Sequence, residues 1–313
     1  MSADEPVNEA LVLASSDLTA DIDRLANAGF RLDMITPADA PRVAELSGHG
    51  LVIRVDTSVE LTPTQPPAVQ DVEGRAGMRY RDLLPDRDGG RVIASHITIP
   101  GSGPVDDYVH HHAIDLQLIY VVRGRVKVVY ETQGDPFWMS AGDCVLQPPH
   151  IRHRVLESAD DCEVIELASP AEHPTFVEHE LELPTAPGDP DQDFGGQRFM
   201  FDTAVDATWE PVASRWEQRV SLVSEASDGA GSVRVLRSRA SAGHTDSMNT
   251  LSVDHRDALC LLVVLDGECG FSTAPGADGR SLSPGDAVTV LAGSSGTLLA
   301  NDTRCSVLEI RVA

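Results

Sequence analysis

Three histidines in the middle of the chain have the residue type and spacing of metal ligands. His110 and His112 flank His111 just before an apolar run, and His153 follows a Pro-Pro turn. Residues two apart in an extended strand share a face, so His110 and His112 point to the same side. A third imidazole on a strand across a small barrel would converge with them, and imidazole binds Zn, Cu, Fe and Ni. The pattern predicts one divalent metal ion per chain; the alternative is a solvated turn.

Short strand-like runs surround these histidines and must position them. Within residues 78–186, runs of β-forming residues occupy 91–99, 116–122, 125–130, 144–147 and 162–167. Turns that contain Gly or Pro separate them, and no long helical periodicity is evident. Several short strands at regular spacing are typical of a β-sandwich or barrel. The sequence therefore predicts a β domain over residues 78–186.

The segment 187–313 repeats this pattern. Three runs have counterparts in the same order: 91–98 with 232–239, 117–128 with 260–271, and 140–149 with 283–292. In both copies the glycine of a Gly-Asp turn lies 18 residues after an earlier turn glycine. Self-similarity at a fixed spacing indicates an internal duplication. A second β domain of the same kind is therefore predicted.

Two motifs around the histidines resemble those of the cupin superfamily. The family's first motif is G(x)5HxH(x)3–4E(x)6G, and here it runs from Gly103 to Gly124 with residues 110–112 at the histidine positions. The second motif is G(x)5PxG(x)2H(x)3N, and here it runs from Gly142 to His153. The resemblance implies a mainly β chain with two double-stranded β-helix barrels, a bicupin.

The resemblance also implies which side chains hold the metal. Carried over position by position, the ligands are His110, His112, Gln117 and His153. The chain departs from the family pattern, because Gln117 replaces a Glu, His150 replaces a Gly and the first spacer is one residue longer. An amide is a weaker donor than a carboxylate, so Gln117 is alternatively a hydrogen-bonding neighbour of the ligands.

The second barrel, 187–313, has lost most of this ligand set. When Cys260 is aligned with Gln117, Val253 and His255 take the places of His110 and His112, and Gly296 takes the place of His153. One imidazole does not make a site. The second barrel is therefore predicted to be structural, with His255 a remnant and His244 a loop residue.

The first block, residues 1–60, resembles one βαβββ half of the vicinal-oxygen-chelate, or glyoxalase-like, family. A strand, a helix that starts at an Asp, a Gly-Phe turn and further strands follow in that order. The metal-binding His and Glu of that family are not recognisable, so a small docking or dimerisation module is expected, with His49 in a turn. The Pro- and Gly-rich stretch 61–77 is expected to be a linker.

Further side chains are candidates for a substrate pocket in the first barrel. They are His96, Tyr108, Ile119, Phe137, Trp138 and His150. Ile119 shares the strand face of Gln117, while the others lie near the predicted barrel mouth or on crossing strands. With neutral ligands only, the metal would keep its full charge and would favour an anionic enolate, phenolate or carboxylate group. No catalytic residue is assigned.

These features favour a metal-dependent dioxygenase or related oxidoreductase acting on a small, anionic, oxygen-bearing substrate, aromatic compounds included. Cupins with three His ligands include O₂-activating iron enzymes, so Fe(II) is favoured, with Zn, Mn, Ni or Cu as alternatives. The second hypothesis is a non-redox isomerase, cyclase or lyase that uses the ion to stabilise an enolate. The third is a non-catalytic bicupin that binds a small ligand.

Composition limits the partners. The 313 residues include 24 Lys and Arg against 49 Asp and Glu, a formal net charge of −25. Such a surface repels nucleic acid and anionic membranes. No apolar run reaches the roughly 20 residues of a membrane helix, and no signal peptide is evident. Five scattered cysteines are expected to be reduced thiols in a cytoplasmic protein, and a homodimer is expected.

Overall fold

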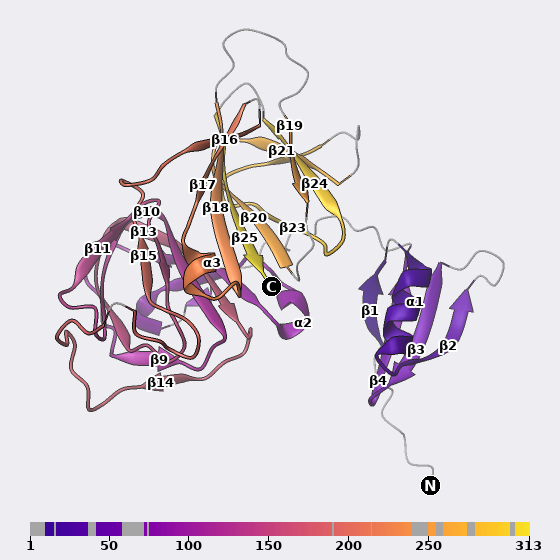
Figure 1. Cartoon of the computed structure of the whole chain (residues 1–313), viewed down its shortest axis with the longest axis horizontal. Coiled ribbons are helices and arrows are strands. Elements are labelled where there is room, and N and C mark those ends of the chain that lie inside the picture. Colours follow the sequence, from indigo (N-terminus) through magenta and orange to yellow (C-terminus); the bar gives the residue numbers. More distant parts are fainter. Residues whose placement is uncertain are drawn as a thin grey trace. The chain divides into compact units, whose positions relative to one another are not determined.

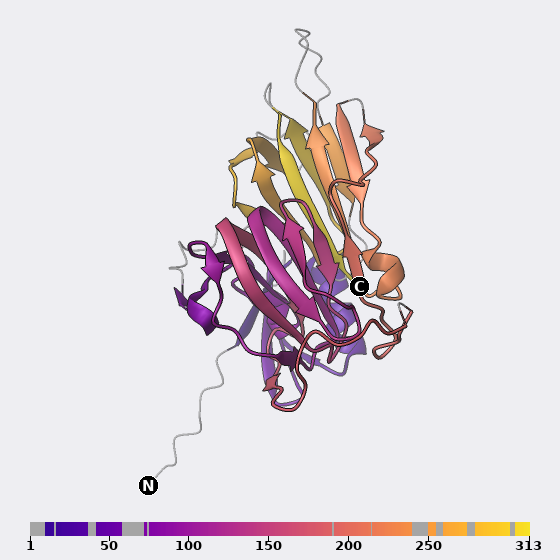
Figure 2. The same ribbon diagram turned by 90° about the vertical axis from the view of Figure 1, so that its left-hand side faces the viewer.

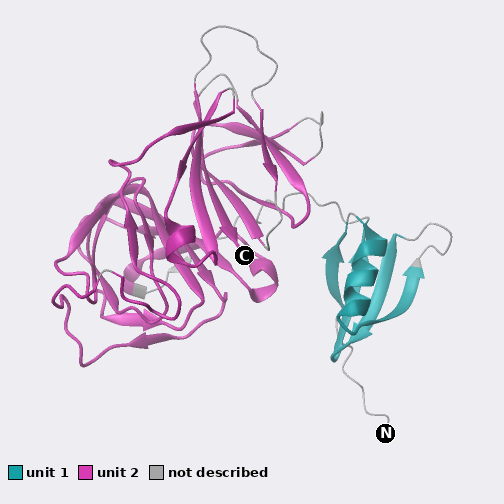
Figure 3. Ribbon diagram, viewed as in Figure 1, with its two compact units in different colours: residues 1–64 teal, residues 65–313 magenta. Residues whose placement is uncertain are grey.

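The computed structural model divides into two compact units, residues 1–64 and 65–313 (Figure 3). The residues that it describes are 10–15, 17–36, 42–57, 72–73, 75–189, 191–213, 215–239, 250–254, 259–273, 279–300 and 304–313. Much of the predicted linker 61–77, together with His244 and His255, lies outside them. No helix in the described part is long and apolar enough to cross a membrane.

The first unit is a small α+β module. Its elements are β1 (Leu11–Ala14), α1 (Leu18–Asn27), β2 (Arg31–Thr36), β3 (Val43–Gly48) and β4 (Leu51–Asp56). The helix begins where the Asp17 side chain accepts a hydrogen bond from the Ala20 amide, as an N-cap does. The described strands form a sheet in the order β1-β4-β3-β2, and α1 packs on its buried Leu46 and Val55. The expected βαβββ order is thus present.

The second unit contains two β-barrels. The elements of the first barrel are β5 (Val72–Glu73), η1 (Arg75–Gly77), β6 (Arg79–Asp82), α2 (Arg87–Gly90), β7 (Ile93–Ile99), β8 (Gly103–Pro104), β9 (His110–His112), β10 (Leu116–Tyr130), β11 (Phe137–Ser140), β12 (Cys144–Leu146), β13 (His153–Ser169) and β14 (Thr175–Val177). Together with β15 (Met200–Asp202), its described strands form one 11-stranded sheet. Because β15 pairs with β12, this sheet extends into the segment 187–313.

The second barrel is built from two sheets. Its elements are β16 (Glu210–Ala213), β17 (Trp216–Val220), α3 (Val223–Ala226), β18 (Gly231–Ser238), β19 (Thr250–Asp254), β20 (Leu259–Asp266), β21 (Cys269–Ser272), β22 (Arg280–Leu282), β23 (Ala287–Val290), β24 (Ser295–Ala300) and β25 (Ser306–Val312). The sheet orders among the described strands are β16-β17-β18-β25-β20-β23 and β19-β24-β21-β22. The mainly β fold of two barrels and a small α+β module is as predicted.

The two faces of the long strand β10 point to different parts of the molecule. Its residues alternate, so that Leu118 and Tyr120 face the core between the barrels while Ile119 and Val121 face the interior of the first barrel. The strand bends at Gly124, whose φ is +67° and where a Cβ would lie 2.6 Å from the Ala159 carbonyl oxygen. Only glycine suits that position.

The two barrels pack against each other through apolar faces (Figures 1 and 2). One buried cluster joins Leu118, Leu146 and Leu167 of the first barrel with Leu261, Val263 and Leu308 of the second. Two arginines form reciprocal contacts across the same boundary. Arg81 donates to the Gly285 carbonyl at 3.2 Å, and Arg219 donates to the Gly142 carbonyl at 2.6 Å. These glycines occupy corresponding Gly-Asp turns in the two copies.

Candidate metal centre

The three predicted imidazoles meet at one end of the first barrel. His110 and His112 lie on β9, and His110 pairs directly with His153 at the start of β13. All three are buried, and one ligand nitrogen from each lies within 4.8 Å of the others. The parity argument for the His-x-His pair is therefore confirmed: the two rings share a face, and His111 points to the other side, where it stacks on Phe176.

Backbone carbonyls set the tautomer of two of these rings. The Nδ1 of His110 lies 2.8 Å from the Tyr108 carbonyl oxygen, and the Nδ1 of His153 lies 3.0 Å from that of Ile151. A carbonyl only accepts hydrogen bonds, so both Nδ1 atoms carry the proton and donate it. The Nε2 lone pairs are then the ones that a metal ion would use.

The third ring is held from an outer strand. The Nδ1 of His112 lies 2.8 Å from the Thr175 hydroxyl on β14, which pairs with β9. Three buried imidazoles, each with its Nδ1 hydrogen-bonded and a ligand nitrogen near the other two, are a donor set for a transition metal ion. The residues present therefore fit a bound divalent metal.

An amide that the sequence analysis did not identify contacts the triad. The Nε2 of Gln147 lies 3.0 Å from the Nε2 of His153. Because the His153 Nδ1 carries the proton, its Nε2 accepts and the amide donates. Gln147 is buried and lies two residues beyond Val145, which faces the barrel interior. Strand parity applied to residues 144–147 would have indicated its direction.

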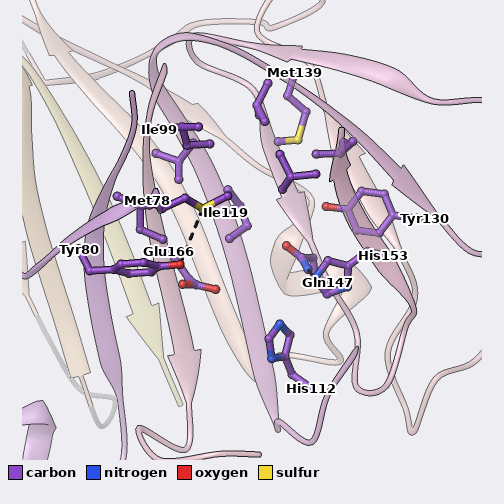
Figure 4. Close-up of a pocket in the computed structure, with 15 residues that line it drawn as sticks. Met78, Tyr80, Ile99, His112, Ile119, Tyr130, Met139, Gln147, His153 and Glu166 are labelled. Carbon is purple, nitrogen blue, oxygen red and sulfur yellow. Dashed lines mark hydrogen bonds between the residues drawn. The ribbon is translucent and has the colours of Figure 1, made fainter. Parts of the chain in front are cut away.

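Gln117 is buried, and its amide nitrogen donates to the Glu166 carboxylate at 2.6 Å. Glu166 lies on β13 opposite Ile119 and lines the pocket beside the triad (Figure 4). The expectation of a site without protein charge is therefore wrong, because this carboxylate stands in the pocket. The expectation failed because strand register, which brings Glu166 beside Gln117, is not readable from spacing. A ligand role for Gln117 remains a prediction.

The pocket next to the triad is mostly apolar (Figure 4). Its lining consists of Met78, Tyr80, Ile97, Ile99, His112, Ile119, Val126, Val128, Tyr130, Met139, Gln147, His153, Val155, Val164 and Glu166. Burial raises the pKa of Tyr130 well above its usual value, so its hydroxyl stays protonated near neutral pH. Tyr130 also stacks on His153, with ring centroids 5.6 Å apart. The lining is thus mostly hydrophobic and includes a few polar side chains.

Of the six predicted wall residues, only Ile119 is among those lining side chains. The Nε2 of His96 lies 3.2 Å from the Glu163 carboxylate, and Tyr108 is 42% exposed, with its ring at 76° to that of His110. His150 is exposed and its Nδ1 lies 3.3 Å from that of His111. It adopts a φ of +61°, which suits the glycine that the motif would have there.

The two remaining wall candidates lie on β11 outside the pocket lining. Phe137 packs against Tyr130 and Phe201, with ring centroids 6.0 and 4.6 Å apart. Trp138 is covered by the guanidinium of Arg125, 4.8 Å from its ring centroid. Both aromatic side chains therefore support the barrel wall.

The second barrel has no counterpart of the triad among its described residues. Val253 pairs with Gly296, as His110 pairs with His153. A Cβ on Gly296 would lie 2.5 Å from the ring of Phe271, so the Phe271 side chain fills that space. Over the described parts of the whole chain, the histidine triad is the one group of three metal-binding side chains that lie close together.

Comparisons with known proteins agree with this architecture. Residues 95–167 match the cupin domain family, and no curated protein sequence matches the chain. A mutant of salicylate 1,2-dioxygenase from Pseudoaminobacter salicylatoxidans is similar in structure, with a TM-score of 0.52, 15% identity, and coverage of 71% of this chain and 70% of that one. Oxalate decarboxylase from Lactobacillus farciminis has a TM-score of 0.55, 13% identity, and coverage of 77% and 83%.

A storage-type protein shares the fold as well. Procruciferin, an 11S globulin from Brassica napus, has a TM-score of 0.53, 12% identity, and coverage of 74% and 79%. None of these comparisons covers a glyoxalase-like module, so that resemblance of residues 1–60 is not confirmed. At such identities the similarity shows the fold alone. Residues 95–167 therefore match the cupin domain family, within a chain whose mainly β fold of two barrels is shared with these structures.

Proposed function

We propose that the chain is a metal-dependent oxygenase of the dioxygenase type, with Fe(II) as its ion. The observation that carries this proposal is the buried triad of His110, His112 and His153, of which His112 and His153 line an apolar pocket. A redox-active ion held there would supply the electron-transfer chemistry that lets O₂ react with an organic substrate. Histidine is a common ligand of iron in such sites.

The pocket lining limits the substrate. Among the described residues that line the pocket there is no Arg or Lys, and Glu166 is the carboxylate. A dicarboxylate as small as oxalate would have no cation other than the metal to neutralise its second charge, and it would face Glu166. A substrate with an apolar body, such as an aromatic ring, and a single anionic oxygen suits this lining better. An additional hydroxyl or N–H donor on the substrate could bond to Glu166.

The protein's own groups have separable roles in this proposal. The three imidazoles hold the ion through Nε2, and their Nδ1 partners keep the rings oriented. The side-chain amide of Gln147 lies 3.0 Å from the His153 Nε2, and once that nitrogen holds the ion the amide would be free to donate a hydrogen bond to an oxygen of a bound ligand. Ile97, Val128 and Met139 line the cavity and exclude water from the reacting atoms.

Glu166 supports a second candidate function. A carboxylate beside the metal site could take a proton from a carbon next to a carbonyl, with the ion stabilising the enolate. The enzyme would then be a non-redox isomerase, cyclase or lyase. In the oxygenase, Glu166 bonds to the substrate and takes up no proton during turnover.

Metal analysis combined with O₂ uptake tests these proposals. Protein purified without a His-tag should hold about one iron per chain and should consume O₂ with a small phenol or hydroxybenzoate and not with oxalate. His112→Ala should hold no metal and consume no O₂. Zinc without O₂ uptake, but with substrate turnover, would support the non-redox enzyme. Ligand binding without turnover would contradict both and favour the non-catalytic bicupin.

A further inference from the structure

The hydrogen bond between Gln117 and Glu166 fixes which way the Gln117 amide faces. A carboxylate only accepts, so the atom 2.6 Å from the Glu166 oxygen must be the amide nitrogen. The amide oxygen lies on the other branch of the same carbon and is turned away from Glu166. The pairing therefore assigns the orientation of an amide whose two ends otherwise look alike.

Gln117 lies next to the triad through its strand neighbours. It shares the inward face of β10 with Ile119, which lines the pocket. Its backbone carbonyl accepts a hydrogen bond from the backbone N–H of Gln147 at 2.9 Å, and the side chain of Gln147 contacts His153. The Gln117 oxygen is therefore on the branch turned away from Glu166, and the backbone of Gln117 is bonded to the residue that contacts His153.

The second barrel keeps the same carboxylate but surrounds it with cations. Glu309 pairs with Leu262 as Glu166 pairs with Ile119. Arg234 binds Glu309 through two hydrogen bonds of 2.8 and 2.7 Å, and Arg311 adds a third of 2.7 Å.

In the first barrel, the register positions of those two arginines are occupied by small residues. Ser95 pairs with Glu166 where Arg234 pairs with Glu309. Ala168 pairs with Gln117 where Arg311 pairs with Cys260. Glu309 is neutralised by two arginines. Glu166 instead contacts the Gln117 amide and lies in the barrel that carries the candidate metal site.

We propose that Glu166 is a positioning residue for the metal centre. It accepts a hydrogen bond from the Gln117 amide nitrogen, so that the amide oxygen faces the ion. It also supplies the negative charge that a Glu ligand would carry, but without binding the ion directly. Gln117 and Glu166 together then replace a single carboxylate ligand. This inference rests on the metal-binding part of the proposed function.

Co²⁺ binding by the metal-free full chain tests the charge contribution. Co²⁺ does not require O₂ exclusion, and its visible spectrum reports the ligand set. Glu166→Gln keeps a hydrogen-bonding partner for Gln117 but removes the charge, and it should weaken Co²⁺ binding about tenfold or more. Glu163→Gln, three residues away on the same strand and paired with Arg123, should leave the affinity unchanged.

The exchange variant Gln117→Glu/Glu166→Gln tests the orientation. It conserves the total charge and the hydrogen bond but moves the carboxylate to β10, where it should bind the ion directly. Co²⁺ affinity should return to at least the wild-type value, and the spectrum should differ from that of the wild type. Thermal unfolding of each metal-free variant checks that it folds.

Two results would overturn the inference while leaving the metal enzyme intact: an unchanged Co²⁺ affinity in Glu166→Gln, or a wild-type Co²⁺ spectrum in the exchange variant. A wild-type chain that binds neither Co²⁺ nor any other divalent ion through its triad would instead refute the proposed function itself.

Discussion

In the first barrel His110 lies opposite His153, and in the second barrel Val253 lies opposite Gly296 at the corresponding strand pair. Phe271 fills the space beside Gly296, whereas Val128, its counterpart in the repeat, lines an open pocket. The same backbone register therefore supports a mostly apolar cavity beside the histidine triad in one copy and a packed core in the other. The difference lies in side-chain volume and in how the shared carboxylate is neutralised.

The largest expected effect separates the two copies by metal content. His110→Ala should reduce the bound metal from about one ion per chain to near zero, because two imidazoles hold a divalent ion far less tightly than three. Val253→Ala, at the corresponding position of the second barrel, should leave the metal content unchanged. Elemental analysis of both variants measures the metal content. Metal retained by His110→Ala would contradict the assignment of the metal site to the first barrel.

The second prediction concerns the buried carboxylate of the second barrel. Arg234→Met removes the two-point partner of Glu309, which is 2% exposed, and should cost about 3 kcal/mol of unfolding free energy, the low end for a buried pair, because Arg311 remains bonded to Glu309. Arg123→Met, in an exposed pair with Glu163, should cost no more than about 1 kcal/mol. Urea unfolding measures both. Adding Glu309→Gln should recover part of the loss, and equal effects of the two arginines would show that Glu309 is not effectively buried.

A smaller effect is expected from crowding the closed interior. Gly296→Ala places a methyl group against the Phe271 ring and should cost about 1–3 kcal/mol of unfolding free energy. In the double variant with Phe271→Leu the cost should be less than the sum of the single ones, because the smaller side chain gives way. Additive costs would mean that the ring does not limit this position.

The smallest expected effect tests how the open interior tolerates charge. Gln117→Glu, made alone, brings a second carboxylate against Glu166, and the two would then share a proton. The metal-free variant should be about 1 kcal/mol less stable than wild type at pH 7, and the difference should vanish toward pH 4, where the pair holds its shared proton. Urea unfolding at the two pH values checks this. Equal stability at both would show that the carboxylates do not meet.

The triad could be predicted from sequence because its determinants are local. Parity places His110 and His112 on one face whatever the strand pairs with, and the Pro-Pro turn and the second cupin-like motif indicate His153 on another strand. The degenerate copy could be recognised for the same reason, since Val253 and Gly296 stand at aligned positions.

Other parts of the site depend on long-range register. Glu166 reaches Gln117 because β13 pairs with β10 at one particular offset, which no spacing reveals. His150 was expected near the pocket, but its left-handed backbone turns it toward His111 on the outer side. Regular strand parity does not hold through such a turn.

The reciprocal contacts of Arg81 and Arg219 resemble a two-fold symmetric interface, because each barrel donates an arginine to the corresponding Gly-Asp turn of the other. Here both partners belong to one polypeptide, so their association is intramolecular and independent of protein concentration. Two identical subunits would change together with every mutation. Two covalently joined copies can diverge. Both keep the arginine contact, but the interior of the second barrel is filled by side chains while the first barrel keeps its cavity. The predicted homodimer would then have to use another surface.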